Sequence, residues 1–191
     1  MTGNMRRMLA LVAGAVMGTA LAVLGTLYAT GAFAFQENQE EMRQQQVAEK
    51  GSEVMPFDLE ATTHVYEKTA NGGVQKVVAD DPDDAENVAA IREHLREEAD
   101  AFSRGEFSDP VSIHGEDMPG LAELETGAER VEVRYEELPD GAQIALESED
   151  PELVAAVHDW FDAQLSDHGD DATEADGQGE GMNASEHEEH H

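Results

Sequence analysis

The sequence predicts a small α+β domain made of two copies of a β-hairpin followed by a helix, preceded by one transmembrane or signal helix. Three observations support this prediction. Two stretches within residues 55–169 repeat one plan, each holds a turn motif between two strand-like runs, and an uncharged apolar run opens the chain. Two such units, neither able to cover its own apolar face, are expected to pair into a four-stranded antiparallel sheet backed by two helices.

The start of the chain is typical of a membrane segment. Arg6 and Arg7 precede the uncharged run 8–35, which at about 1.5 Å per residue can cross a hydrocarbon core of about 30 Å. Its length favours an uncleaved signal anchor in the cell membrane. The alternative is a signal peptide, because Ala32-Phe33-Ala34 matches a signal-peptidase site whose cleavage after Ala34 would give a secreted chain. In both cases the arginines keep the N-terminus inside and place the soluble part outside.

Two features near this run concern a partner chain and a spacer. Gly14 and Gly18 form a G-x-x-x-G pattern, which allows two membrane helices to approach closely in a homodimer. Residues 36–54 are rich in Glu and Gln and contain no apolar stripe wide enough for a core. We therefore expect a polar stalk between the membrane segment and the domain.

The first copy of the repeat begins with a hairpin over residues 61–79, with Asn71-Gly72-Gly73 at its turn. Asn-Gly supplies the positive φ angles that a type I′ turn needs. A helix is expected next, with Asp81 as N-cap, Pro82 at the first helical position and Gly105 as its stop. Its buried stripe is expected to contain Val88, Ile91, Leu95, Ala99 and Phe102.

The second copy covers residues 130–169 and follows the same order: strand, Pro139-Asp140-Gly141, strand, Asp150-Pro151, helix. Equivalent residues of the strands and turns lie 69 positions apart, as shown by Tyr66 and Tyr135. The helices align at an offset of 66, because the first copy carries three extra residues before its helix. This agreement predicts a duplicated ββα unit within one domain over residues 55–169.

The remaining residues, 170–191, are expected to form a disordered acidic tail that contains histidines. His187-Glu188-Glu189-His190-His191 matches the H-E-x-x-H pattern of metalloproteases, but it lies at the end of this tail without a third ligand. A loose chelating or salt-solubilising tail is the favoured interpretation. Asn183-Ala184-Ser185 is a glycosylation sequon, a short pattern that arises often by chance.

The acidic composition excludes several classes of function. The chain has 43 Asp and Glu residues against 11 Lys and Arg, a net charge of −32. Such a chain repels phosphate, so no nucleic-acid binding is expected. High salt screens its self-repulsion, which indicates a halophilic setting. Because there is no cysteine, disulfides, thiolate catalysis and cysteine zinc sites are excluded.

Several stretches also resemble a known group of proteins. They include "MPFDLEATTHVYEKTANGGVQKVVADDP", "IHGEDMPGL", "RYEELPDGAQI" and "WFDAQLSDHG", and they cover most of residues 55–169. They are similar to small uncharacterised prokaryotic proteins that often bear the label aspartate carbamoyltransferase. True carbamoyltransferases have Ser-Thr-Arg-Thr and His-Pro-x-Gln motifs, and neither motif occurs in this sequence. The resemblance therefore supports the extent of the domain and implies no carbamoyltransferase activity.

The histidines of the domain are the candidates for a metal site. His64 aligns with Val133 of the second copy and is expected to point toward the helices, and His168 falls at the end of the second helix. His94 and His158 lie on the flanks of the helix stripes. We predict a copper or zinc site from imidazoles of a strand and two helices, completed by Met118 or a carboxylate. The candidate ligands are His64, His114, Met118, His94 and His158.

The opposing interpretation is that these are ordinary part-buried histidines bonded to carboxylates, since no H-x-H or H-x₃-H pair occurs in the domain. The connection "SIHGEDMPGL", residues 112–121, is the best candidate region because it has no counterpart in the second copy, and loops often carry function. Gly115 and Pro119 oppose a helix through His114 and Met118, and Asp117 is expected to cap a short helix after it.

No nucleophile elbow or phosphate-binding glycine loop occurs, and acidic pairs such as Glu97-Glu98 are expected on solvated faces. The sequence therefore favours a membrane-anchored or secreted extracytoplasmic binding or interaction module without catalytic residues, and transition-metal binding is the sharper form of this hypothesis. The alternative is a small exported enzyme whose reaction and small-molecule substrate the sequence does not identify.

Overall fold

The computed structural model describes residues 36 and 38–175, in a chain that divides into two units, 1–45 and 46–191. The described residues of the first unit are helical, and residues 46–54 of the second unit are helical too. Val47 is 2% exposed within the second unit. The apolar run 8–35, the Gly14 and Gly18 pair and the end of the tail lie outside the described residues. Among the residues described, no helix combines the length and apolarity that a membrane span requires.

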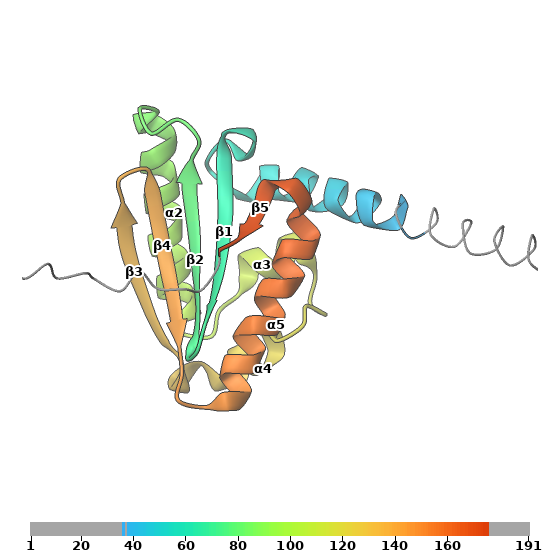
Figure 1. The fold of residues 1–191 in the computed structure, drawn as a ribbon, viewed down its shortest axis with the longest axis vertical. Helices are drawn as coiled ribbons and strands as arrows, with labels where there is room; N and C mark the ends of the chain where they lie inside the picture. Colours follow the sequence, from blue (N-terminus) through green and yellow to red (C-terminus); the bar gives the residue numbers. More distant parts are fainter. Residues whose placement is uncertain (1–35, 37, 176–191) are drawn as a thin grey trace, which may run out of the picture. The chain divides into compact units, whose positions relative to one another are not determined.

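The fold is α+β, as predicted, and its sheet has five strands in the order β3-β4-β2-β1-β5 (Figure 1). The four strands of the two hairpins pair antiparallel, and β5 runs parallel to β1. The strands are β1 Thr62–Thr69, β2 Gly72–Ala79, β3 Glu132–Leu138, β4 Gly141–Glu147 and β5 Ala172–Glu174.

The prediction of four strands was wrong by one, because β5 lies in the segment assigned to the acidic tail. Main-chain hydrogen bonds along the free edge of β1 are available to any backbone, so β5 needs no apolar pattern of its own. Ala172 lies opposite His64 in this parallel pair. The added strand therefore covers the sheet edge beside His64.

The two copies of the repeat meet at the centre of the sheet, where β2 and β4 pair antiparallel. Gln75 of β2 lies opposite Ile144 of β4. These residues are equivalent in the two copies, so the local twofold axis that relates the hairpins passes between them. Each hairpin alone is too small to be stable, and this pairing joins them into one sheet.

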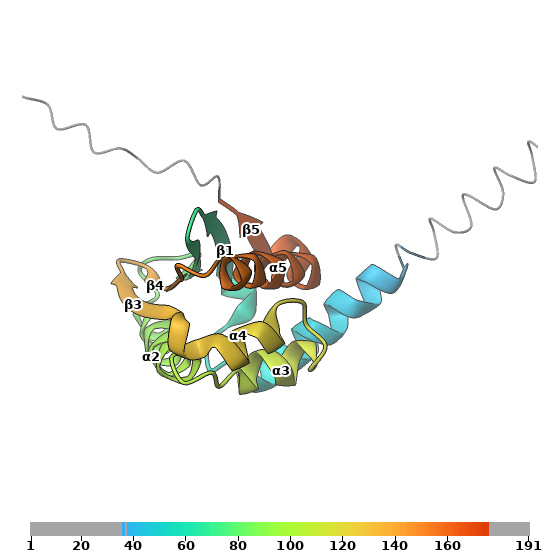
Figure 2. The same cartoon turned by 90° about the horizontal axis from the view of Figure 1, so that it is seen from below.

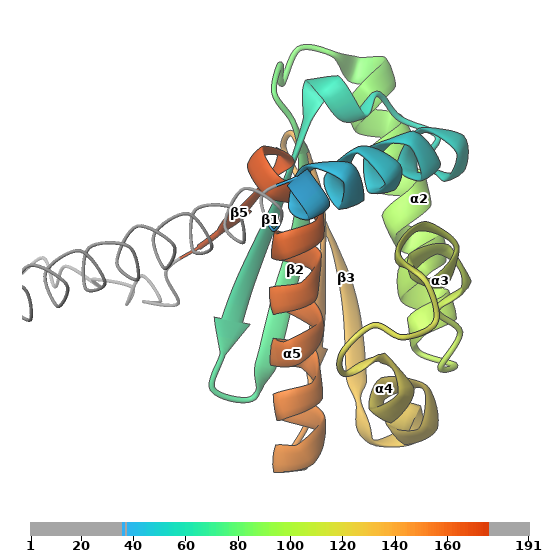
Figure 3. The ribbon, with the colours of Figure 1, turned by 90° about the vertical axis from the view of Figure 1, so that its right-hand side faces the viewer.

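Helices α2 (Ala85–Phe102) and α5 (Pro151–His168) cover one face of the sheet, and the shorter α3 (Ser108–His114) and α4 (Leu121–Gly127) lie on the same side (Figures 2 and 3). Between the sheet and the helices lies the core, which includes Ile91 and Leu95 of α2, Trp160 and Phe161 of α5, and Ile144 of β4. Trp160 and Phe161 are fully buried, as their spacing predicts.

The start of α5 is as predicted, and the start of α2 is not. Asp150 caps α5, with Pro151 at its first position. In the first copy, Asp81 closes a turn by accepting a hydrogen bond from the N–H of Asp83 at 3.0 Å. Asp84 is the N-cap instead, and its carboxylate accepts from the N–H of Asn87 at 3.1 Å. The three extra residues of this copy form the turn and delay the helix.

The connection between the two copies also differs from the prediction. His114 is the last residue of α3, and Gly115 ends that helix at a φ of 96°. The second short helix begins after Gly120, at a φ of 77°, so Asp117 does not cap it. Glycine is needed there because a Cβ would meet the Ala156 carbonyl oxygen of α5 at 2.0 Å. His114 and Met118 do not share a helix, as expected.

Candidate metal centre

A cavity of about 20 Å³ between the sheet and the helices has an unusually polar lining. Four histidines contribute to it, each from a different element: His64 from β1, His94 from α2, His114 from α3 and His168 from α5. His64, His94 and His114 are between 4% and 6% exposed. Imidazoles that converge from four elements toward one cavity resemble a binding site more than an incidental feature of a core.

Four buried polar atoms on the wall of this cavity have no hydrogen-bond partner among the described residues. They are Gln75 Oε1, His94 Nε2, Trp160 Nε1 and Gln164 Oε1. Leaving such an atom unpaired costs about 1–3 kcal/mol, so a native fold keeps few of them without a functional reason. Three of the four are equipped to accept a hydrogen bond or to bind a cation, and the indole of Trp160 is the one obligatory donor.

The repeat shows that the core does not require all of this polarity. Val133 and Ile144 occupy, in the second copy, the positions that His64 and Gln75 occupy in the first. Ile144 is fully buried. Because an apolar residue serves the same place in the equivalent hairpin, the polar residues of the first hairpin fit a role other than packing.

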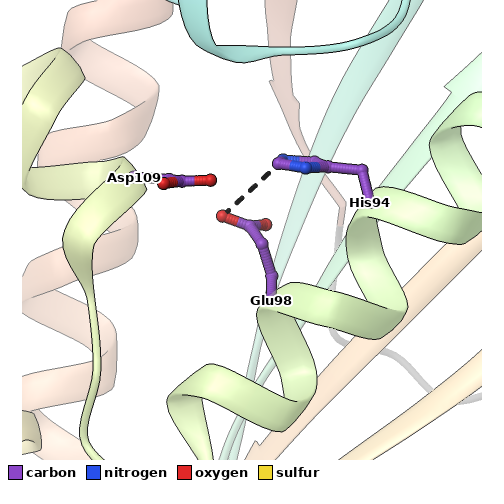
Figure 4. A group of neighbouring side chains, drawn as sticks. All are labelled: His94, Glu98 and Asp109. Atoms are coloured by element: carbon purple, nitrogen blue, oxygen red, sulfur yellow. Dashed lines mark ion pairs between the residues drawn. The ribbon is translucent and has the colours of Figure 1, made fainter.

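One group beside this cavity already has the arrangement of a metal site. His94 and Glu98 lie one turn apart on α2, and Asp109 of α3 points toward them from across the pocket (Figure 4). One ligand atom from each residue lies within 4.8 Å of the other two. His94 Nε2 and Glu98 Oε1 are 3.9 Å apart, too far for a hydrogen bond and close enough to share an ion.

The electrostatics of the trio follow from burial. The pKa of Glu98 is raised to about 8, chiefly by desolvation and then by the negative charge of Asp109. Desolvation also lowers the pKa of His94. At neutral pH the imidazole is therefore neutral with a lone pair available, and Glu98 is a protonated acid that an arriving cation would deprotonate.

A second, larger pocket adjoins the trio. It has a volume of about 160 Å³, and its lining shares His94 and Glu98 with the inner cavity. Glu97, Glu106 and Asp109 add carboxylates to its wall. The trio thus lies between an acidic pocket and a cavity lined with imidazoles.

The other three histidines that line the inner cavity form a ring cluster. The ring centroids of His64 and His168 are 5.0 Å apart with nearly parallel planes, and those of His114 and His168 are 5.1 Å apart. His114 donates from Nδ1 to Asp167 Oδ2 at 2.8 Å. Burial, and to a smaller extent the neighbouring imidazoles, lower the pKa of His64 to about 4 and that of His168 to about 3.

The structure brings three of the five candidate ligands together and leaves two apart. His64, His94 and His114 line the inner cavity. Met118 packs in the apolar core, and His158 donates from Nε2 to the carbonyl oxygens of Thr69 and Gly72 at 3.0 and 2.8 Å. His158 therefore ties α5 to the first hairpin turn, a role that its chain position does not indicate.

Two carboxylates of the trio were not among the candidates. Glu98 is 7% exposed, so the expectation that Glu97-Glu98 lies on a solvated face is wrong for Glu98. Its position could have indicated burial, because it follows Ile91 by seven residues and Leu95 by three, on the apolar stripe of α2. Asp109 carries no such signal, since it reaches the trio only through the position of α3.

Comparison of the chain with protein-family models, with curated proteins and with solved structures gave no match.

Proposed function

We propose that this protein is an exported metal-binding module whose ion, Zn²⁺ or a similar divalent d-block cation, is held by His94, Glu98 and Asp109. The observation that carries the proposal is His94 Nε2, a buried atom without a hydrogen-bond partner in the described chain, which faces two carboxylates. A lone pair and two acidic groups in a confined space are the donors that zinc takes in proteins.

The spacing of the donor atoms fits such an ion. Zinc binds imidazole nitrogen and carboxylate oxygen at about 2.0–2.2 Å, which places neighbouring donors of a tetrahedral shell about 3.3–3.6 Å apart. The separation of 3.9 Å between His94 and Glu98 needs only a small side-chain movement to reach that range. With three protein ligands, a fourth position remains toward the adjoining pocket.

Charge favours the same assignment. Two carboxylates and a neutral imidazole neutralise a divalent ion, whereas the metal-free site must bury an acid whose pKa is already raised. Carboxylate ligands favour zinc over Cu⁺, which prefers softer donors.

The extracytoplasmic location rests on the sequence alone. The run 8–35 would anchor the module in the cell membrane, with a homodimer through Gly14 and Gly18, or cleavage after Ala34 would release it. The acidic surface suits a salt-rich medium and concentrates cations near the protein.

The test is zinc titration of the full-length chain in detergent, without an affinity tag and with the tail residues His187, His190 and His191 replaced by serine. We expect Glu98→Gln combined with Asp109→Asn to remove one bound zinc ion per chain. Glu97→Gln is the matched control, because Glu97 lies next in sequence and lines the same pocket but does not belong to the trio.

Calorimetry gives the number of bound ions, and circular dichroism verifies that each variant is folded. If the folded double variant binds as much zinc as the tail-substituted parent, with equal affinity, the trio is not a metal site.

A further inference from the structure

We propose a second metal site, formed by His64, His114 and His168, that takes an imidazole-preferring divalent cation, Cu²⁺ or Zn²⁺. It is independent of the carboxylate trio: it shares none of its three ligands, and its donors are all nitrogens. The chain would then hold two ions of different preference on the two sides of His94.

The ring separations support this site. A metal bound at about 2.0–2.1 Å from an imidazole nitrogen lies about 3 Å from the centre of that ring. Two rings on one tetrahedral ion therefore have centroids about 5 Å apart. The measured separations from His168 are 5.0 Å to His64 and 5.1 Å to His114.

The rings of His64, His114 and His168 are not oriented as they would be around a bound metal ion. In the described part of the chain, the carboxylate trio is the one group of three or more such residues whose donor atoms all lie within 4.8 Å of one another. Binding by the three imidazoles thus requires ring rotation about the side-chain torsions, with little change in the ring centres. His168, in the last turn of α5, is the central ring of the cluster.

Asp167 supplies the support that a metal-binding histidine usually has. Its carboxylate accepts a hydrogen bond from His114 Nδ1 at 2.8 Å, and the carboxyl and imidazole side chains are both largely buried. A proton on Nδ1 suits this bond to a carboxylate, and Nε2 is then the nitrogen through which His114 would bind a metal ion. A carboxylate behind the imidazole is the common outer partner of a metal-bound histidine.

The surroundings of the cluster suit a cation better than an anion. Gln75 and Gln164 present unpaired carbonyl oxygens to the same cavity. Their amide oxygens offer lone pairs, as do His64 and His168, whose pKa values are lowered, and no lysine or arginine of the described residues lines the cavity. One metal ion can satisfy several of these lone pairs at once, which separate protons cannot do because charged imidazoles this close repel one another.

Comparison of the two copies shows that packing does not demand these histidines. His64 corresponds to Val133, and His168 corresponds to Phe102 at the end of α2. Phe102 is 2% exposed, so an apolar ring fills the equivalent place in the other helix. His114 lies in the connection that only one copy has. The histidine cluster is therefore specific to one copy of the repeat, because the equivalent positions of the other copy hold apolar residues.

The experiment is electron paramagnetic resonance of the full-length chain loaded with Cu²⁺, again with the three tail histidines replaced by serine. Electron spin-echo modulation counts the imidazoles bound to copper. We expect about three in the parent at one equivalent of Cu²⁺, and the same count after Glu98→Gln with Asp109→Asn. His168→Gln should reduce the count and weaken binding at least about tenfold, and so should His64→Gln.

His158→Gln is the matched control, because this imidazole lies on α5 outside the cavity. His64 is buried, so its replacement can impair folding. Only variants that keep the parental circular dichroism spectrum are therefore compared. His168 lies at the end of α5, where a substitution is better tolerated. A parent that binds copper through one imidazole or none would overturn the proposal, as would a count unchanged in folded His168→Gln. Loss of zinc from the trio leaves this outcome unaffected, so the two sites are tested separately.

Discussion

At the scale of single residues, Glu98 is a carboxyl group at a position where ionisation is unfavourable. Its pKa rises from 4.5 in the unfolded chain to about 8 in the metal-free fold. Between these values the folded protein binds more protons than the unfolded chain, so the free energy of unfolding decreases as pH rises. The destabilisation caused by Glu98 is therefore absent below about pH 4.5 and reaches its full size above about pH 8.

Glu98→Gln should therefore stabilise the metal-free protein, and the gain should increase from pH 5 to pH 8 to a few kcal/mol. Urea unfolding in the presence of a chelator measures this difference at each pH. Glu97→Gln is the control, because it removes the neighbouring carboxylate in the sequence, and Glu97 is exposed. An equal gain from both variants, or a gain that shrinks as pH rises, would show that Glu98 is not held in its protonated form.

Residue chemistry also explains how much of the site the sequence could predict. His64 and His94 are identifiable because they align with the apolar residues Val133 and Trp160 of the second copy. His114 is identifiable because it lies in the polar connection that has no counterpart there. Glu98 and Asp109 are two of 43 acidic residues, so their type carries no information. The inclusion of Met118 rested on its closeness to His114 in the chain, whereas the fold directs Met118 into the apolar core.

At the scale of elements, the caps show where local sequence rules decide the structure. Asp-Pro begins both helices in the predicted repeat, yet it does so only in α5, where the chain has no extra residues. Capping depends on which carboxylate reaches the free N–H groups of the first turn. In α2 the three-residue insertion makes Asp84, rather than Asp81, the residue that caps the helix. Strand β5 likewise forms because β1 has a free edge, which no local sequence pattern predicts.

Asp84→Ala should lower the free energy of unfolding by about 1 kcal/mol, because the N–H of Asn87 loses its partner at the start of α2. Asp81→Ala removes the same charge three residues earlier, where the carboxylate closes an exposed turn. We expect a loss of less than about 0.5 kcal/mol there. Denaturant unfolding of both variants in the same salt measures the difference, and a larger loss for Asp81→Ala would restore it as the N-cap.

At the scale of the whole molecule, duplication provides the scaffold and divergence provides the site. The twofold relation at Gln75 and Ile144 places equivalent elements on opposite sides of the sheet centre. Within that frame, polar residues accumulate around His94, while the equivalent strand positions keep Val133 and Ile144. A domain selected only for stability has no need of these buried polar residues, so the asymmetry between the copies supports the proposal of metal sites at this end of the fold.

The net charge of −32 adds a force that acts on the whole chain, because the carboxylates repel one another most strongly when the protein is compact. Salt should therefore stabilise the metal-free protein, since the Debye length shortens from about 30 Å at 0.01 M to about 3 Å at 1 M. We expect the midpoint of thermal unfolding to rise steeply with KCl at low concentration and to level off as screening becomes complete. NaCl at equal ionic strength should give the same curve, because screening depends on ionic strength rather than on the cation. A midpoint that climbs linearly through high salt would instead indicate strengthened apolar burial, and a midpoint independent of salt would contradict charge repulsion as the main penalty on this fold.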